Sequence, residues 1–146
     1  MLKYGTTIIG LVFLVFGIIR LGVSTLLLLH LYDMVEFSEL REAIVEVSNF
    51  LSDNNKISII SFSPLGYLSY LWLMGALLII GAIGCLKRNR LATLAISLFL
   101  LLYVLLFVNF QTINPKIIHL FVCAALFSVY IWLNKRACNN QVTDSF

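Results

Sequence analysis

The chain has 146 residues, of which 61% are hydrophobic and 12% charged, with a formal net charge of +3 and a mean hydropathy of +1.00. Soluble domains carry about 25% charged residues, so this composition excludes an ordinary water-soluble domain. The ten Lys and Arg residues are too few and too scattered for a nucleic-acid-binding surface, which excludes nucleic acid as a partner.

Four long apolar segments follow one another along the chain, each close to the roughly 20 residues that a helix needs to cross the bilayer hydrocarbon. They cover approximately residues 4–31, 64–86, 91–110 and 117–134. Helices are expected there because lipid offers no hydrogen bonds to the backbone. The connectors "KRNR" (87–90) and "QTINPK" (111–116) are short enough to force neighbouring spans to be antiparallel. The sequence therefore predicts an all-α polytopic membrane protein, a single-domain antiparallel bundle of four transmembrane helices.

Basic residues mark one side of this predicted bundle. Most of the seven acidic residues lie between the first and second spans. Loops enriched in Lys and Arg face the cytoplasm, so we expect both termini and the tail 135–146 to be cytoplasmic, in the bacterial inner membrane. The first span is too long for a cleaved signal peptide and is expected to stay as an anchor. The basic residues that set this topology are Lys87, Arg88, Arg90, Lys135 and Arg136, with Lys3 on the same side.

The acidic segment after the first span has a helical pattern over about residues 36–52. Its apolar residues recur at steps of three and four, with Glu39, Glu42 and Glu46 on the opposite face. We expect an amphipathic helix on the outer surface, whose apolar stripe covers the ends of the spans. The stripe consists of Phe37, Leu40, Ile44, Val47 and Leu51.

Arg20 is the one charged residue within the apolar body of any span. At 100° per residue it shares a helix face with small and polar residues, among them Gly17 and Ser24. Small residues allow close helix contact, so this face is expected to point into the bundle. A rise of 1.5 Å per residue puts Arg20 about 24 Å from Tyr4, in the outer third of a hydrocarbon core roughly 30 Å thick.

Arg20 is therefore the centre of the predicted site. Ionisable residues inside membranes are functional candidates, and we expect a polar outer-leaflet site that binds a ligand such as a lipid headgroup or a quinone. Its other residues are Ser24, Tyr67, Tyr70, Asn109 and His119. Two alternatives remain: Arg20 snorkels to fix the height of its helix, or it pairs with an acid on another protein.

Small residues predict where helices pack. Motifs for catalysis or metal binding are not found in the sequence. Helix packing is expected at Gly10, Gly17, Gly75, Gly81 and Ala82. The three cysteines form no disulfide framework. The sequence has no CxxC, HExxH, GxSxG or glycine-rich phosphate loop. We therefore expect no metal and no catalytic residues, which favours a protein that is not an enzyme.

Two stretches resemble a known membrane-protein family. "GLVFLVFGIIRL" (10–21) resembles the first span of DoxX-like proteins, and "LMGALLIIGAIGCLKRNRLATLAISLFLLLYVLLF" (73–107) is similar to their second and third spans. The resemblance implies four spans, cytoplasmic termini and an outer segment after the first span. Arg20 stands where the family has lysine, and the cysteine pairs of redox-linked members are missing, so electron transfer is not implied.

Two functions follow as hypotheses. The first is a non-enzymatic accessory or assembly subunit, whose glycine faces and basic turn contact a membrane protein or a second copy of the chain. The second is a quinone- or lipid-binding protein with its site around Arg20. A small transporter is less favoured, because no membrane carboxylate is present for proton coupling and no inverted repeat is evident. Apart from such a quinone or lipid, no cofactor is expected; the bilayer itself is the expected surrounding partner.

Overall fold

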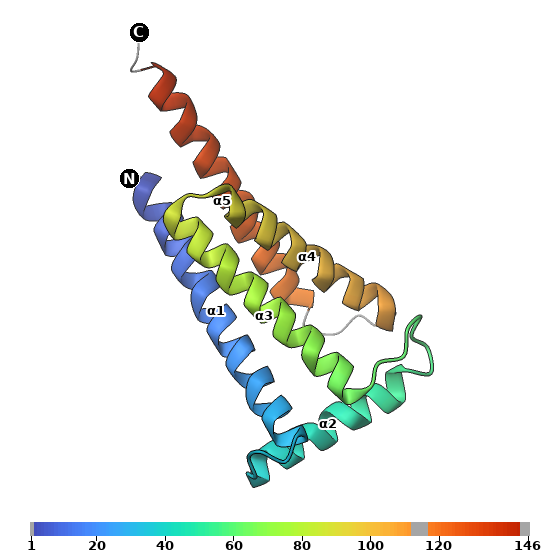
Figure 1. The fold of residues 1–146 in the computed structure, drawn as a ribbon. Coiled ribbons are helices and arrows are strands. Elements are labelled where there is room, and N and C mark those ends of the chain that lie inside the picture. Colours follow the sequence, from blue (N-terminus) through green and yellow to red (C-terminus); the bar gives the residue numbers. More distant parts are fainter. Residues whose placement is uncertain (1, 112–116, 144–146) are drawn as a thin grey trace.

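The computed structural model describes residues 2–111 and 117–143, and this part of the chain is all-helical. Four of its helices are long and apolar enough to cross a membrane, as predicted. The fifth, α2, lies across one end of the others (Figure 1); this end is called the α2 end below. The helices are α1 (Leu2–Leu31), α2 (Ser38–Asn54), α3 (Pro64–Lys87), α4 (Arg90–Phe110) and α5 (Ile117–Thr143).

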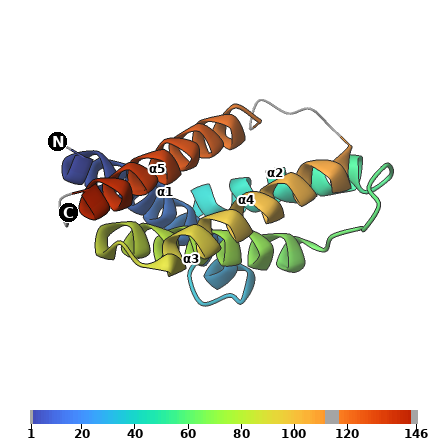
Figure 2. The same ribbon diagram turned by 90° about the horizontal axis from the view of Figure 1, so that it is seen from above.

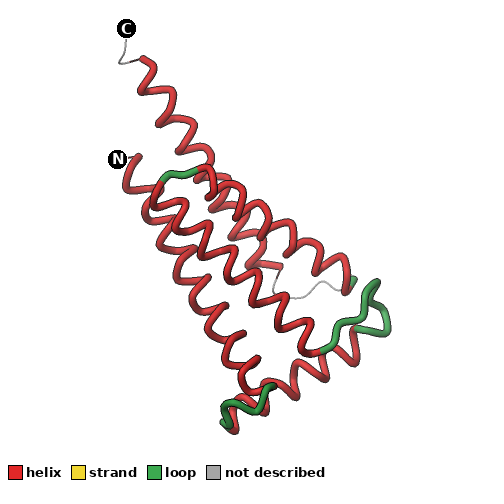
Figure 3. Tube along the Cα trace, in the orientation of Figure 1, coloured by secondary structure: helices red, strands yellow, loops and turns green. Residues whose placement is uncertain are grey.

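The long helices alternate in direction. In Figure 1, α1 and α4 run toward the α2 end, whereas α3 and α5 run away from it. The loops before and after α2 both lie at the α2 end, and the turn between α3 and α4 lies at the opposite end (Figure 3). Most of the connector between α4 and α5 lies outside the described residues.

Local backbone chemistry sets several helix ends. The Ser63 hydroxyl accepts a hydrogen bond from the Gly66 N–H at 3.1 Å, and Pro64 occupies the first turn of α3, where no N–H is needed. Arg88 ends α3 in the left-handed conformation (φ 53°), and its N–H bonds to carbonyls of the last turn. The chain can therefore reverse within the basic turn and begin α4 at Arg90.

The end of α5 differs from the expectation. The sequence predicts that the fourth span ends near Asn134, which agrees with the candidate span Ile117–Arg136, but the helix α5 itself continues through Thr143. Hydropathy reports only the segment that suits lipid, and polar residues continue a helix beyond the lipid without penalty. The last residues of the expected tail, 144–146, lie outside the described residues.

Glycines bring α3 very close to α1. A Cβ on Gly75 would lie 2.9 Å from the backbone nitrogen of Leu21, and one on Gly17 would lie 2.7 Å from Ile79 Cγ1. Gly10 packs against the Cys85 Cβ in the same interface. These three predicted packing residues therefore sit where α1 and α3 meet, and their missing side chains permit the contact.

Glycines also bring α3 close to α4. A Cβ on Gly84 would lie 2.6 Å from the backbone nitrogen of Ala92, and one on Gly81 would lie 2.6 Å from Ile96 Cγ1. Ala82 is completely buried. The three helices α1, α3 and α4 thus share one core of interlocked side chains, which includes Phe13, Met74, Leu78, Ile96 and Phe99.

The outward faces of the long helices are apolar. Large side chains such as Ile18, Leu94 and Phe121 are more than half exposed. At most 44% of the apolar stretch of any of the four candidate spans is buried within the chain. Exposed apolar surface on this scale is not tolerated by soluble monomers, so the fold supports an integral membrane location.

Charge is divided between the two ends. The exposed basic residues of the α3–α4 turn lie opposite the α2 end (Figure 1). Helix α2 carries Glu39, Glu42 and Glu46 as exposed residues.

Leu51 is the buried residue of the stripe expected on α2, whereas Phe37 is 57% exposed. Phe37 is the extended N-cap residue, and its side chain does not follow the helix periodicity.

We expect Gly84→Ala to destabilise the fold by about 1–3 kcal/mol, because the new methyl group overlaps the backbone of α4. The matched control is Gly22→Ala, since a Cβ at Gly22 meets no atom within 4 Å. That control should be neutral or stabilised by up to about 1 kcal/mol through helix propensity. The measurement is the free energy of unfolding in mixed detergent micelles; equal stability of both variants would contradict the close α3–α4 contact.

Candidate functional site

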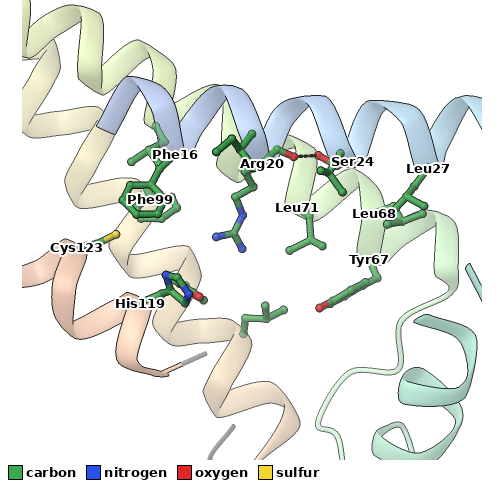
Figure 4. A pocket seen from close by; sticks show the side chains of 15 residues that line it. Phe16, Arg20, Ser24, Leu27, Tyr67, Leu68, Leu71, Phe99, His119 and Cys123 are labelled. Atoms are coloured by element: carbon green, nitrogen blue, oxygen red, sulfur yellow. Dashed lines mark hydrogen bonds between the residues drawn. The ribbon is translucent and has the colours of Figure 1, made fainter. Parts of the chain in front are cut away.

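A cavity of about 430 Å³ lies among the four long helices, in their half nearer the α2 end. Helix α1 contributes Arg20 and Ser24, α3 contributes Tyr67, and α5 contributes His119 and Cys123 (Figure 4). Leucine, isoleucine and valine side chains form much of the remaining wall, together with Phe16 of α1 and Phe99 and Tyr103 of α4. We call this the Arg20 cavity. Its volume lies within the range of about 300–1,000 Å³ that is usual for small-molecule pockets.

The guanidinium of Arg20 points into this cavity (Figure 4). Its Nη2 donates to the Met74 Sδ at 3.8 Å. Its Cζ lies 4.9 Å from the centre of the Tyr103 ring and 5.8 Å from that of Phe99, which are cation–π distances. A thioether is only a weak acceptor, and the described residues that line the cavity include no Asp or Glu.

The small and polar face of α1 sets this direction. Thr6, Phe13 and Ser24 on that face are at most 3% exposed, and Gly17 lies against α3. Arg20 belongs to the same face, so its side chain leaves the helix on the inner side. The Ser24 hydroxyl donates to the Arg20 carbonyl at 2.5 Å, so its hydrogen is already used by the helix backbone.

The predicted site residues separate into two groups. Arg20, Ser24, Tyr67 and His119 line the Arg20 cavity. Tyr70 and Asn109 line a different, apolar cavity of about 320 Å³ between α3, α4 and the loop before α3. The Tyr70 hydroxyl donates to the Leu102 carbonyl at 2.7 Å, so this residue links α3 to α4 rather than facing Arg20.

Asn109 holds a loop in place. Its Oδ1 accepts from the Ile60 N–H at 2.7 Å, and its Nδ2 donates to the Ile60 carbonyl at 3.0 Å. The Asn109 carbonyl also accepts from the Ile59 N–H at 3.1 Å. The amide therefore satisfies both backbone groups of Ile60 and ties the loop between α2 and α3 to the end of α4.

Phe99, Tyr103 and Met74 are contacts of Arg20 that the sequence prediction omits. Phe99 and Tyr103 are four residues apart and share one face of α4. This spacing is a detectable signal. However, α4 is apolar on every side, so its periodicity does not show which face meets Arg20.

A cluster rich in aromatic residues borders the Arg20 cavity at the α2 end. Its buried members are Leu51, Tyr67 and Phe110, and Phe50 and Phe62 pack against them. The ring centres of Phe50 and Phe110 are 5.3 Å apart, and those of Tyr67 and Phe110 are 6.0 Å apart. Because Tyr67 belongs both to this cluster and to the cavity wall, the cluster borders the cavity.

No protein-family model, curated protein or solved structure matches this chain. The DoxX-like resemblance therefore stays an expectation based on the quoted residues.

We expect Asn109→Ala to free the loop before α3, because the N–H and C=O of Ile60 lose their partners. The expected cost is about 1–3 kcal/mol, with faster amide hydrogen exchange at Ile59 and Ile60. Asn49→Ala, at an exposed position of α2, is the control and should leave exchange unchanged. If the two variants exchange alike at these residues, Asn109 does not hold the loop.

Proposed function

We propose that the protein binds a ligand with an anionic or carbonyl oxygen, of the kind that a lipid headgroup or a quinone presents, in the Arg20 cavity. The observation that carries this proposal is the guanidinium of Arg20, which points into the cavity and has a thioether as its hydrogen-bond acceptor. The proposed function is binding, with no chemical reaction attached.

The energetics of an embedded cation favour such a ligand. Removing a charged side chain from water costs several kcal/mol unless a partner compensates. The rings of Tyr103 and Phe99 contribute some attraction. A ligand oxygen would add a hydrogen bond to a charged group, worth about 1.5–3 kcal/mol. The cavity has room for that oxygen and for the group that carries it.

The accessory-subunit hypothesis has less support from the structure. It relied on the small residues of α3 and on the basic turn 87–90 as surfaces for another protein, and the basic residues of this turn are exposed. Gly75 and Gly81 instead contact Leu21 and Ile96 of the same chain, and Ala82 is fully buried. This ridge is therefore already occupied by α1 and α4 and is not available to a partner.

The membrane arrangement belongs to the same proposal. The chain is proposed to form an antiparallel four-span bundle of DoxX-like type in the bacterial inner membrane, with α2 as an amphipathic helix on the outer face. The support is the separation of charge, with Lys87, Arg88 and Arg90 exposed at the end opposite α2. Both termini are then cytoplasmic under the positive-inside rule.

This arrangement predicts opposite labelling of two exposed positions. In a cysteine-free variant carrying Asp53→Cys, a membrane-impermeant maleimide should label intact cells, because Asp53 is exposed in the last turn of the proposed outer helix α2. Asn89→Cys, in the α3–α4 turn, should be labelled only after the membrane is permeabilised. Labelling of Asn89→Cys in intact cells would reverse the orientation.

The proposed ligand binding is tested by native mass spectrometry, which measures how much added dodecyl phosphate the protein retains. We expect Arg20→Ala to weaken its binding about 10- to 100-fold, which corresponds to the loss of a charged hydrogen bond. Arg41→Ala, at an exposed position of α2, should bind as the unaltered protein does. Dodecanol should bind weakly to all three proteins, because it lacks the anionic oxygen.

Unfolding measurements separate lost binding from lost folding. Arg20→Ala should insert at least as well as the unaltered protein, since a charge within a span opposes insertion. Equal binding of dodecyl phosphate by folded Arg20→Ala and Arg41→Ala would refute the proposed function.

A further inference from the structure

We infer that the ligand reaches the Arg20 cavity from the bilayer, through a lateral opening between α1 and α5, and that it carries a hydrocarbon tail which stays in this opening. The inference rests on the proposed function and specifies the ligand class as an amphiphile rather than a water-soluble anion. Three features of the cavity support it. The opening is defined by Phe16, Ile19, Val23 and His119.

The first feature is the uneven exposure of the cavity wall. Ile19 and Val23 of α1 line the cavity and are nevertheless 58% and 53% exposed. His119 of α5 is also exposed. On the opposite wall, Leu68 and Phe99 are at most 1% exposed. Leu71 of α3 and Leu106 of α4 also line the cavity and are partly exposed. The most exposed part of the described wall therefore lies between α1 and α5.

The second feature is the relative course of these two helices. Near the N-terminus, a Cβ on Gly5 of α1 would lie 3.0 Å from Leu133 Cδ1 of α5. Figure 2 shows α1 and α5 crossing near the N-terminus and separating toward the α2 end. Beside the cavity they meet through the edge-to-face contact of Phe16 with His119, whose ring centres are 6.2 Å apart.

The third feature is the packed cluster at the α2 end. The cluster of Leu51, Tyr67 and Phe110 borders the cavity there through Tyr67. Tyr67, which belongs to the cluster and to the cavity wall, is 5% exposed, and Leu27 and Leu68 of the wall are 7% and 0% exposed. A water-soluble anion arriving at this end would have to displace packed aromatic rings, whereas the lateral opening faces the apolar surroundings of Ile19 and Val23.

These features place the two parts of an amphiphile. An oxygen of its headgroup meets the guanidinium of Arg20, and its tail lies against Ile19 and Val23, where apolar surface would otherwise face lipid. The tail then remains in hydrocarbon throughout binding. Only the headgroup exchanges its surroundings, and Arg20 supplies the compensating charge.

A photoreactive dodecyl phosphate with a diazirine at the tail end tests this route. The protein is reconstituted in phosphatidylcholine nanodiscs, illuminated, and mapped by peptide mass spectrometry. We expect labelling to concentrate on residues 16–23 of α1 and 117–123 of α5, about fivefold or more above the lipid-facing residue Leu101 of α4. Arg20→Ala should lower the α1 and α5 labelling to the level at Leu101.

A matched pair of variants tests the opening itself. Val23→Trp fills the opening and should reduce the α1 and α5 labelling about fivefold. Ile18→Trp adds the same ring to α1 at a similarly exposed position, 55% exposed against 53% for Val23, that does not line the cavity. Its labelling should match that of the unaltered protein.

The possible outcomes separate the two proposals. Labelling that depends on Arg20 but falls on α2 or on residues 57–63, or that Val23→Trp leaves unchanged, overturns the lateral route and leaves the proposed function standing. Labelling that is the same in Arg20→Ala and in the unaltered protein refutes the proposed function itself. An inorganic phosphate excess of about a hundredfold should not displace the probe; displacement would overturn the requirement for a tail.

Discussion

The contact between the backbone of α1 and Gly75 of α3 is the constraint on which the site depends. It occurs at Leu21, directly beside Arg20, and it fixes both the rotation and the position of α1 against α3. A second series of close contacts, at Gly81 and Gly84, fixes α4. Because these contacts hold α1, α3 and α4 together, the guanidinium of Arg20 lies beside the rings of Phe99 and Tyr103 on α4. Arg20 is thus positioned by glycines, whose lack of a side chain permits these close contacts.

Much of the fold was predictable because lipid imposes a simple rule on sequence. Apolar length identified all four candidate spans, with starts and ends close to those of the spans found in the structure. The prediction failed where that rule stops applying. Helix α5 continues through Thr143, beyond the apolar segment, and Phe37 departs from the stripe of α2 because it precedes the helix. Hydropathy carries no information on either point.

The site was predictable only in part, for a different reason. Periodicity within one helix is enough to orient Arg20 and Ser24, because small residues mark the inner face of α1. The roles of Tyr70 and Asn109 depend on contacts between distant segments, namely the carbonyls of Leu102 and Ile60. Depth in the membrane suggested that they approach Arg20, but residues at equal depth can face different sides of a helix group.

The Asn109 amide has a mechanical consequence. It links the loop that leads from α2 into α3 to the last turn of α4, and the same helix carries the Tyr103 ring beside the guanidinium. A tilt of α4 would therefore be transmitted to α2 through the loop between α2 and α3, and not through the glycine contacts. The acidic helix α2 and the partly buried Arg20 are thus connected through Asn109, whose side chain and backbone carbonyl both bind the loop before α3.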